Sequence, residues 1–114
     1  MVIHESEIKS NPVYPEGGSG IAKQILAGPR DGYNGFLRKF SLGPGGHSPY
    51  HHHSWSHLVY VLEGSGKLNQ KDGKYPLKQG SVVYLEPDEE HNFQNTGEGE
   101  LVFLCLVPEQ GDSY

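Results

Sequence analysis

Residues 45 to 57 read Gly45-Gly-His-Ser-Pro-Tyr-His-His-His-Ser-Trp-Ser-His57 and hold five of the seven histidines of the chain. Histidine is the commonest metal-ligating side chain, and it binds through a neutral ring nitrogen. Alternate residues of a strand share one face, so His51 and His53 are expected to point one way and His52 the other. The spacing therefore predicts that His51 and His53 form a chelating pair.

His57 has the same parity, but along a straight strand it would lie about 13 Å beyond His53, at roughly 3.3 Å per residue. One metal cannot span that distance. We therefore predict a turn at residues 54–56, after which residues 58–62 pair antiparallel with the preceding strand. A helical arrangement of His53 and His57, as in zinc proteases, is disfavoured by the preceding glycines and proline and by the lack of a glutamate beside His53.

A fourth ligand is expected from the segment Pro87-Asp-Glu-Glu-His91. The proline ends one strand, the acidic residues make a turn, and His91 opens the next strand. A histidine-rich stretch can also be a solvated loop or an expression tag, but this one is internal, keeps strand spacing and has a distant matching histidine. The pattern predicts one divalent transition-metal site from His51, His53, His57 and His91.

Glycine and proline content favours an all-β fold. The 114 residues include 16 glycines and 8 prolines, which is typical of short elements joined by turns, and the length suits one domain. Residues 1–20 are predicted to form an irregular N-terminal arm, and residues 21–110 a barrel or sandwich domain. The strand candidates, without helical periodicity between them, are residues 21–26, 36–42, 58–62, 81–85 and 101–107.

Charge and hydropathy exclude several partners. The net charge is −5 and there is no basic stripe, so nucleic acid is not expected as a partner. The longest strongly apolar run has 7 residues, at 101–107, where a membrane helix needs about twenty. The N-terminal residues lack the features of a secretory signal. Cys105 is the only cysteine, so no disulfide can form within the chain. We expect a cytoplasmic protein that does not span a membrane.

The histidine segments resemble the two motifs of the cupins, a family of small jelly-roll barrels. The first motif comprises Gly46, His51, His52, His53, His57 and Tyr60-Val-Leu-Glu-Gly64, and the second comprises Gly80, Pro87, His91 and Asn95. The resemblance implies a double-stranded β-helix, or jelly-roll barrel, of two antiparallel sheets. It also implies a homodimer, in which the arm of residues 1–20 could be exchanged between copies.

Most metal-binding cupins carry glutamate where this chain has His57. The chain therefore resembles the small tetra-histidine manganese cupins, a likeness that Trp55 and the ending Phe103-Leu-Cys-Leu-Val-Pro108 strengthen. The resemblance favours manganese or iron, whereas imidazole ligation also suits zinc, nickel and copper. An octahedral ion held by four histidines would keep two positions open for water, dioxygen or a substrate, and anionic ligands should bind readily.

The resemblance predicts a metal-dependent oxygenase for a small organic substrate, because such cupins are linked to oxygen-dependent cleavage of aromatic alkenes. The alternatives are a non-catalytic module that binds a small anion or carbohydrate through the metal, a metal-dependent isomerase or lyase, and a structural zinc site. No residue is a convincing general base, so no catalytic residue is assigned.

The predicted pocket residues are Arg38, Phe40, Trp55, Phe93, Phe103 and Cys105. Arg38 is expected on the same strand face as the apolar residues at alternate positions around it. A buried arginine needs a partner. It could bind substrate or pair with a core carboxylate. Cys105 could fill the core or form part of the pocket wall, and Trp55 could shield the metal or cover the end of the barrel.

Overall fold

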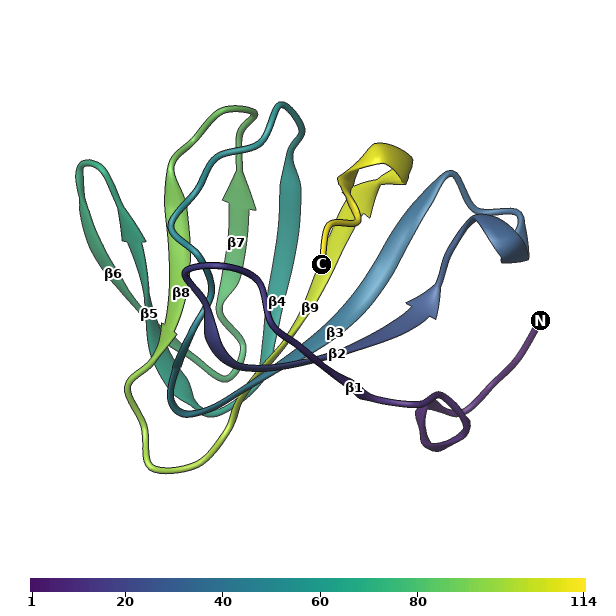
Figure 1. The fold of residues 1–114 in the computed structure, drawn as a ribbon, viewed down its shortest axis with the longest axis horizontal. Coiled ribbons are helices and arrows are strands. Elements are labelled where there is room, and N and C mark those ends of the chain that lie inside the picture. The colour runs from purple at the N-terminus through teal and green to yellow at the C-terminus, as the bar shows by residue number, and fades with distance from the viewer.

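The computed structural model describes all 114 residues, and most of its regular structure is β-strand (Figure 1). The strands are β1 (Asn11–Val13), β2 (Ser19–Ala27), β3 (Gly35–His47), β4 (His57–Glu63), β5 (Ser65–Gln70), β6 (Gly73–Lys78), β7 (Val82–Leu85), β8 (His91–Asn95) and β9 (Leu101–Pro108). The short 3-10 helices are η1 (Glu5–Glu7), η2 (Pro29–Asp31) and η3 (Glu109–Gly111). No helix is long and apolar enough to cross a membrane.

The strands form one curled antiparallel sheet with the order β6-β5-β8-β3-β9-β4-β7, to which β2 and then β1 add alongside β3 (Figure 1). The long strand β3 joins the two walls of the barrel. Its first part pairs with β9, and its last residue, His47, pairs with Gln94 of β8. The predicted jelly-roll barrel is confirmed, and its inner face holds the candidate site.

The core follows the alternation of side chains along the strands. Phe40 and Leu42 of β3 are buried, as are Phe103 of β9 and Phe93 of β8. The rings of Phe93 and Phe103 stack with their centroids 4.7 Å apart, and those of Phe40 and Phe103 lie 5.7 Å apart. Aromatic pairs of this kind add to the free energy gained from burial. They give the interior a rigid aromatic layer next to the histidines.

Two residues of the cupin-like motifs have structural roles. Gly64 has φ +89°, and a side chain there would collide with the backbone carbonyl of Glu100, so the turn after β4 requires glycine. Asn95 is buried, and its amide group ties strand β3 to the loop between β8 and β9. Its Nδ2 donates to the carbonyl oxygens of Leu42, Gly43 and Gly99, and its Oδ1 accepts from the backbone N–H of Gly97.

The strand pairing predicted for residues 58–62 is wrong. Strand β4 pairs with β7 and β9, and residues 48–56 form no strand beyond a single bridge between His51 and His91. The reason is that this segment crosses from the wall containing β8 to the opposite wall. His57 is therefore brought to the site by crossing the barrel, and a hairpin with the preceding strand is not needed.

The hairpin of β5 and β6 was not predicted. Its strands bury only Leu68 and Leu77 among their large side chains, so the hydrophobic signal is weak. Part of the arm predicted to be irregular is extended, because β1 pairs with β2 of its own chain. Pro12 is tolerated there because β1 is an edge strand, where the missing N–H breaks no ladder.

Candidate metal centre

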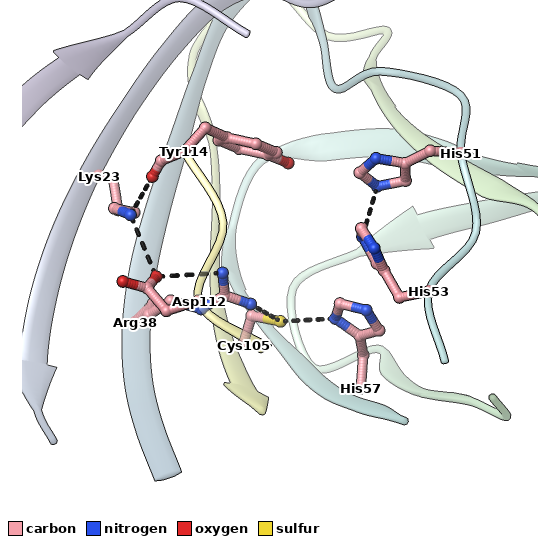
Figure 2. A network of polar contacts seen from close by, with 8 residues as sticks. All are labelled: Lys23, Arg38, His51, His53, His57, Cys105, Asp112 and Tyr114. Carbon is pink, nitrogen blue, oxygen red and sulfur yellow. Dashed lines mark hydrogen bonds and ion pairs between the residues drawn. The ribbon is translucent and has the colours of Figure 1, made fainter. Parts of the chain in front are cut away.

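The four predicted ligands come from three segments of the chain. His51 and His53 lie on the crossing between β3 and β4, His57 opens β4, and His91 opens β8. Mutual backbone hydrogen bonds join two of these segments: the N–H of His51 donates to the carbonyl of His91 at 3.0 Å, and the reverse bond is 2.9 Å. Figure 2 shows His51, His53 and His57 grouped on one side of the interior.

The imidazole groups are close enough to share one ion. The Nε2 atoms of His51 and His53 lie 3.1 Å apart. One ring nitrogen each from His51, His53 and His91 lies within 4.8 Å of the other two. Two nitrogens on the same ion are at most about 4.2 Å apart, because each bond is about 2.1 Å long. Small side-chain rotations would therefore bring these three histidines to bonding distance.

His57 lies at the edge of this group. Its ring centroid is 5.1 Å from that of His53 and 5.3 Å from that of His91. Its Nδ1 is 3.5 Å from the Sγ of Cys105, while its Nε2 is buried and has no hydrogen-bond partner. Buried polar atoms almost always have a partner, so an orphaned imidazole nitrogen beside three others fits a metal ligand.

A hydrogen bond outside the cluster orients His91. Its Nδ1 lies 2.8 Å from the carbonyl oxygen of Glu89, which can only accept, so Nδ1 carries the proton. The lone pair of Nε2 is then free for a metal. Ligating histidines commonly donate their second N–H in this way, which fixes the tautomer.

Burial keeps the cluster uncharged. It lowers the pKa of His51 and His53 to about 4 and that of His57 to about 3, with repulsion from neighbouring positive groups as a further cause. Burial also lowers the pKa of His91, although its hydrogen bond to Glu89 acts in the opposite direction. At neutral pH the rings are therefore neutral, which is the form that binds metals. The residues present fit a divalent transition metal.

Trp55 supports the cluster from outside. Its ring stacks on that of His53 with centroids 4.7 Å apart and an angle of 6° between the planes. Gly111 also approaches the indole so closely that a Cβ there would lie 2.8 Å from the Trp55 Nε1. Trp55 does not line the cavity, contrary to its prediction as a pocket residue, because it lies behind His53. It shields the candidate ligand.

The histidines form one side of a small cavity with a volume of about 30 Å³. Of the predicted pocket residues, those that line it are Arg38, Phe40, Phe93, Phe103 and Cys105. Cys105 also belongs to the core, so both roles predicted for it are present. Burial raises the pKa of its thiol, and the nearby guanidinium of Arg38 only partly offsets this, so the thiol stays protonated at neutral pH.

Arg38 lies on the opposite side of the cavity from the histidines (Figure 2). It is only 3% exposed. Its NH2 donates to the Sγ of Cys105 at 3.1 Å, and its NH1 is 3.5 Å from the Oδ1 of Asp112. The guanidinium also lies 4.9 Å from the ring centroid of Phe40. The predicted carboxylate partner of Arg38 exists, but it comes from the segment after η3 and not from a core strand.

Three residues of this side were not predicted from the sequence: Lys23, Asp112 and Tyr114. The Nζ of Lys23 lies 3.1 Å from the Oδ1 of Asp112 and donates to the backbone carbonyl of Tyr114. Burial raises the pKa of the Tyr114 phenol to about 12. Lys23 has the same strand parity as Ile21 and Ile25, so an inward lysine could have been recognised from its parity. The short segment after η3 carries no periodic signal.

A family model described as the cupin domain matches residues 38–107. The chain is a cupin. It is 28% identical to the oxalate-binding protein of Thermotoga maritima in an alignment of 112 positions that covers 94% of this chain and 93% of that protein. It is 31% identical to the 1-methylthio-D-xylulose 5-phosphate methylsulfurylase of Rhodospirillum rubrum in an alignment of 103 positions that covers 87% of this cupin and 65% of that protein.

Among solved structures, the polyketide cyclase RemF from Streptomyces resistomycificus resembles this cupin with a TM-score of 0.88 and 28% identity. The match covers 95% of this cupin and 78% of the cyclase. The three names describe a binding protein and two different enzymes. Membership of the family therefore does not specify the reaction, which must be argued from the site.

Proposed function

We propose that this cupin holds one divalent transition metal with His51, His53, His57 and His91 and binds a small organic anion beside it. The observation that carries the proposal is that ring nitrogens of His51, His53 and His91 lie within 4.8 Å of one another and share a cavity with a buried arginine. The unpartnered Nε2 of His57 lies beside them. A metal bound there would act as a Lewis acid on an oxygen atom of the ligand. Arg38 would balance the negative charge of the ligand.

Two features support an anion as the ligand. The histidines that would bind the metal are neutral, so they would bring no negative charge to compensate the charge of a divalent ion. The opposite side of the cavity adds the positive charge of Arg38. Lys23 lies outside the lining and shares the single carboxylate of Asp112 with Arg38. The Thermotoga maritima relative is named for binding oxalate, a small dianion.

The experiment combines metal analysis with ligand titration. The protein is loaded with Mn²⁺, Fe²⁺ or Zn²⁺, the metal content is measured by elemental analysis, and oxalate is titrated in a calorimeter. We expect about one equivalent of metal per chain and oxalate binding only in the metal-loaded form. The exposed His52, changed to alanine, is the matched control and should behave as wild type. Sub-stoichiometric metal, or equal oxalate binding without metal, would contradict the proposal.

An oxygenase acting on an aromatic alkene is the second candidate. The aromatic lining of Phe40, Phe93 and Phe103 favours a flat, apolar substrate. Isomerase or lyase chemistry has less support, because the cavity offers no carboxylate base facing the histidines and Cys105 is protonated. The test is oxygen consumption and product formation with candidate alkenes. Turnover that is unchanged in His51→Ala and His91→Ala would reject a metal-dependent oxygenase.

We propose a homodimer formed through the outer face of β4, β7 and β9. Val82 is 72% and Tyr84 57% exposed there, and an apolar groove runs beside them. The residues of the groove are all hydrophobic, so a second copy, itself of net charge −5, meets no like charge on this face. Sedimentation analysis should show a dimer that Val82→Glu converts to a monomer. A monomeric wild type would contradict the proposal.

A further inference from the structure

The segment after η3, residues 112–114, is called the tail below. Its first residue, Asp112, contacts Arg38 from outside the cavity lining, and the other two reach the cavity. Ser113 and Tyr114 line the cavity together with the histidines. The ring centroid of Tyr114 lies 6.1 Å from that of Phe40 and 6.3 Å from that of His51. Figure 2 shows Tyr114 on the same side as Lys23 and Asp112, with its ring extending toward His51. The tail therefore connects the two sides of the site.

The tail supplies the only acidic partner that the structure gives to the two cations of this side. A single oxygen, Oδ1 of Asp112, contacts Lys23 at 3.1 Å and Arg38 at 3.5 Å. The Nε of Arg38 is buried and has no partner. A guanidinium is shaped to bind both oxygens of one carboxylate, so Arg38 is incompletely satisfied in this arrangement. One buried cation, Arg38, and one partly buried cation, Lys23, facing one carboxylate also leave an excess of positive charge.

The tail narrows the cavity. The remaining volume is about 30 Å³, far below the roughly 300–1,000 Å³ of pockets that take drug-sized ligands. A ligand carboxylate that takes over the contact with the NH1 of Arg38 has to displace Asp112. Residues 112–114 have no strand or helix hydrogen bonds to lose, and their attachment is mainly the Lys23 and Arg38 contacts and the packing of Tyr114.

We propose that Arg38 and Lys23 form a carboxylate-binding subsite that Asp112 of the chain itself fills until a ligand carboxylate replaces it and the tail leaves the cavity. The ligand class is a small mono- or dicarboxylate with a second oxygen available for the metal side. This deepens the proposed function and rests on it for the metal. The exchange keeps the two cations paired in both states, which is what buried charges require.

The first test is oxalate affinity of the metal-loaded protein. Asp112→Asn removes the competing carboxylate, so oxalate should bind more tightly, by roughly ten-fold if the tail fills the site about nine-tenths of the time. Glu109→Gln, an exposed residue in η3, is the matched control and should bind as wild type. Unchanged or weaker binding in Asp112→Asn would overturn the proposal, because a purely structural tail predicts that result.

The second test does not depend on the metal. Cys105 is the only cysteine, it lines the cavity, and its alkylation by iodoacetamide can be followed by mass spectrometry in the metal-depleted protein without oxalate. Asp112→Asn and, separately, Tyr114→Ala should react at least several-fold faster than wild type. Alkylation rates equal to that of wild type in both variants would overturn the proposal that the tail closes the cavity. Failure of metal loading would reject the proposed function while leaving this result interpretable.

Discussion

The two sides of the cavity differ in charge and in how the chain builds them. The histidine side, made by His51, His53, His57 and His91, is neutral and has ring nitrogens turned toward one another. The cation side consists of Arg38 in the cavity wall and Lys23 outside it, and both contact the carboxylate of Asp112. Imidazoles can be buried without a counter-charge, whereas buried cations need one. The difference shows that one side can attract a cation and the other an anion within the same small space.

The largest expected effect is the loss of metal from the histidine side. His51→Ala and His91→Ala each remove a ligand, so the fall in metal affinity should exceed the roughly 10–100-fold loss that follows changes in outer-shell partners. Competition with a chromogenic chelator measures the affinity. His52→Ala is the matched control, since this ring is exposed and lies near Asp88 instead. Wild-type metal affinity in both His51→Ala and His91→Ala would show that the histidine side does not bind the metal, and the two sides would then not differ in function.

The next effect falls on anion binding. Arg38→Met should leave the metal content unchanged and weaken oxalate binding by about ten-fold or more, since a hydrogen bond to a charged group contributes about 1.5–3 kcal/mol. Calorimetric titration of the metal-loaded variant measures this change. Arg30→Met, at an exposed position, is the control. If Arg38→Met lost metal and oxalate together, the two sides could not be treated as separate in function.

Acid should destabilise the metal-free protein through the histidine side. In the folded state the pKa of His51 and His53 is about 4 and that of His57 about 3, against an ordinary value of 6.5. Between these values the unfolded chain binds more protons, so the free energy of unfolding falls as the pH decreases. This contribution is fully present above about pH 6.5 and is lost progressively toward pH 4 and below.

Urea unfolding of the metal-free protein from pH 8 to pH 4 measures that dependence. Bound metal should shift the loss of stability to lower pH, because the ion competes with protons for the same nitrogens. His57→Phe should flatten the pH dependence of the metal-free protein, since it removes the group with the lowest pKa. A free energy of unfolding that stays constant between pH 6.5 and pH 4 would show that the rings are not held neutral by burial.

The smallest effect concerns Trp55. Trp55→Ala removes the ring stacked on His53 and should weaken metal binding by about two- to ten-fold, because an aromatic pair contributes about 0.5–1.5 kcal/mol. Trp55→Phe keeps a stacking ring and should recover most of the affinity. The same chelator competition measures both variants. If Trp55→Phe lost as much affinity as Trp55→Ala, the stack would not be the reason for the effect.

The contrast between the two sides also explains what could be predicted from the sequence. The histidine side is encoded locally: the parity of His51 and His53, and their motif with His91, indicated the cluster and the jelly roll. The cation side is assembled from β2, β3 and the residues after η3, with no spacing that links them. Arg38 was recognised by its apolar neighbours, but its partner Asp112 lies 74 positions away. Nothing local marks such a pair.

The predicted geometry around His57 was wrong for a related reason. The distance along a straight strand showed that the chain must turn after His53, and this much followed from the sequence. The identity of the strand that β4 pairs with depends on which wall the chain enters, which is set by long-range packing against β7 and β9. The weakly hydrophobic strands β5 and β6 were missed because their burial is also decided by their neighbours.

The most direct test of the central claim is a crystal structure of the metal-loaded protein recorded at the absorption edge of the metal. We predict one anomalous peak among the ring nitrogens of His51, His53, His57 and His91, at about 2.0–2.2 Å from those that bind. A peak bound instead by the acidic residues of the turn before His91, or no peak in a metal-loaded crystal, would contradict the assignment of the histidines as the metal centre.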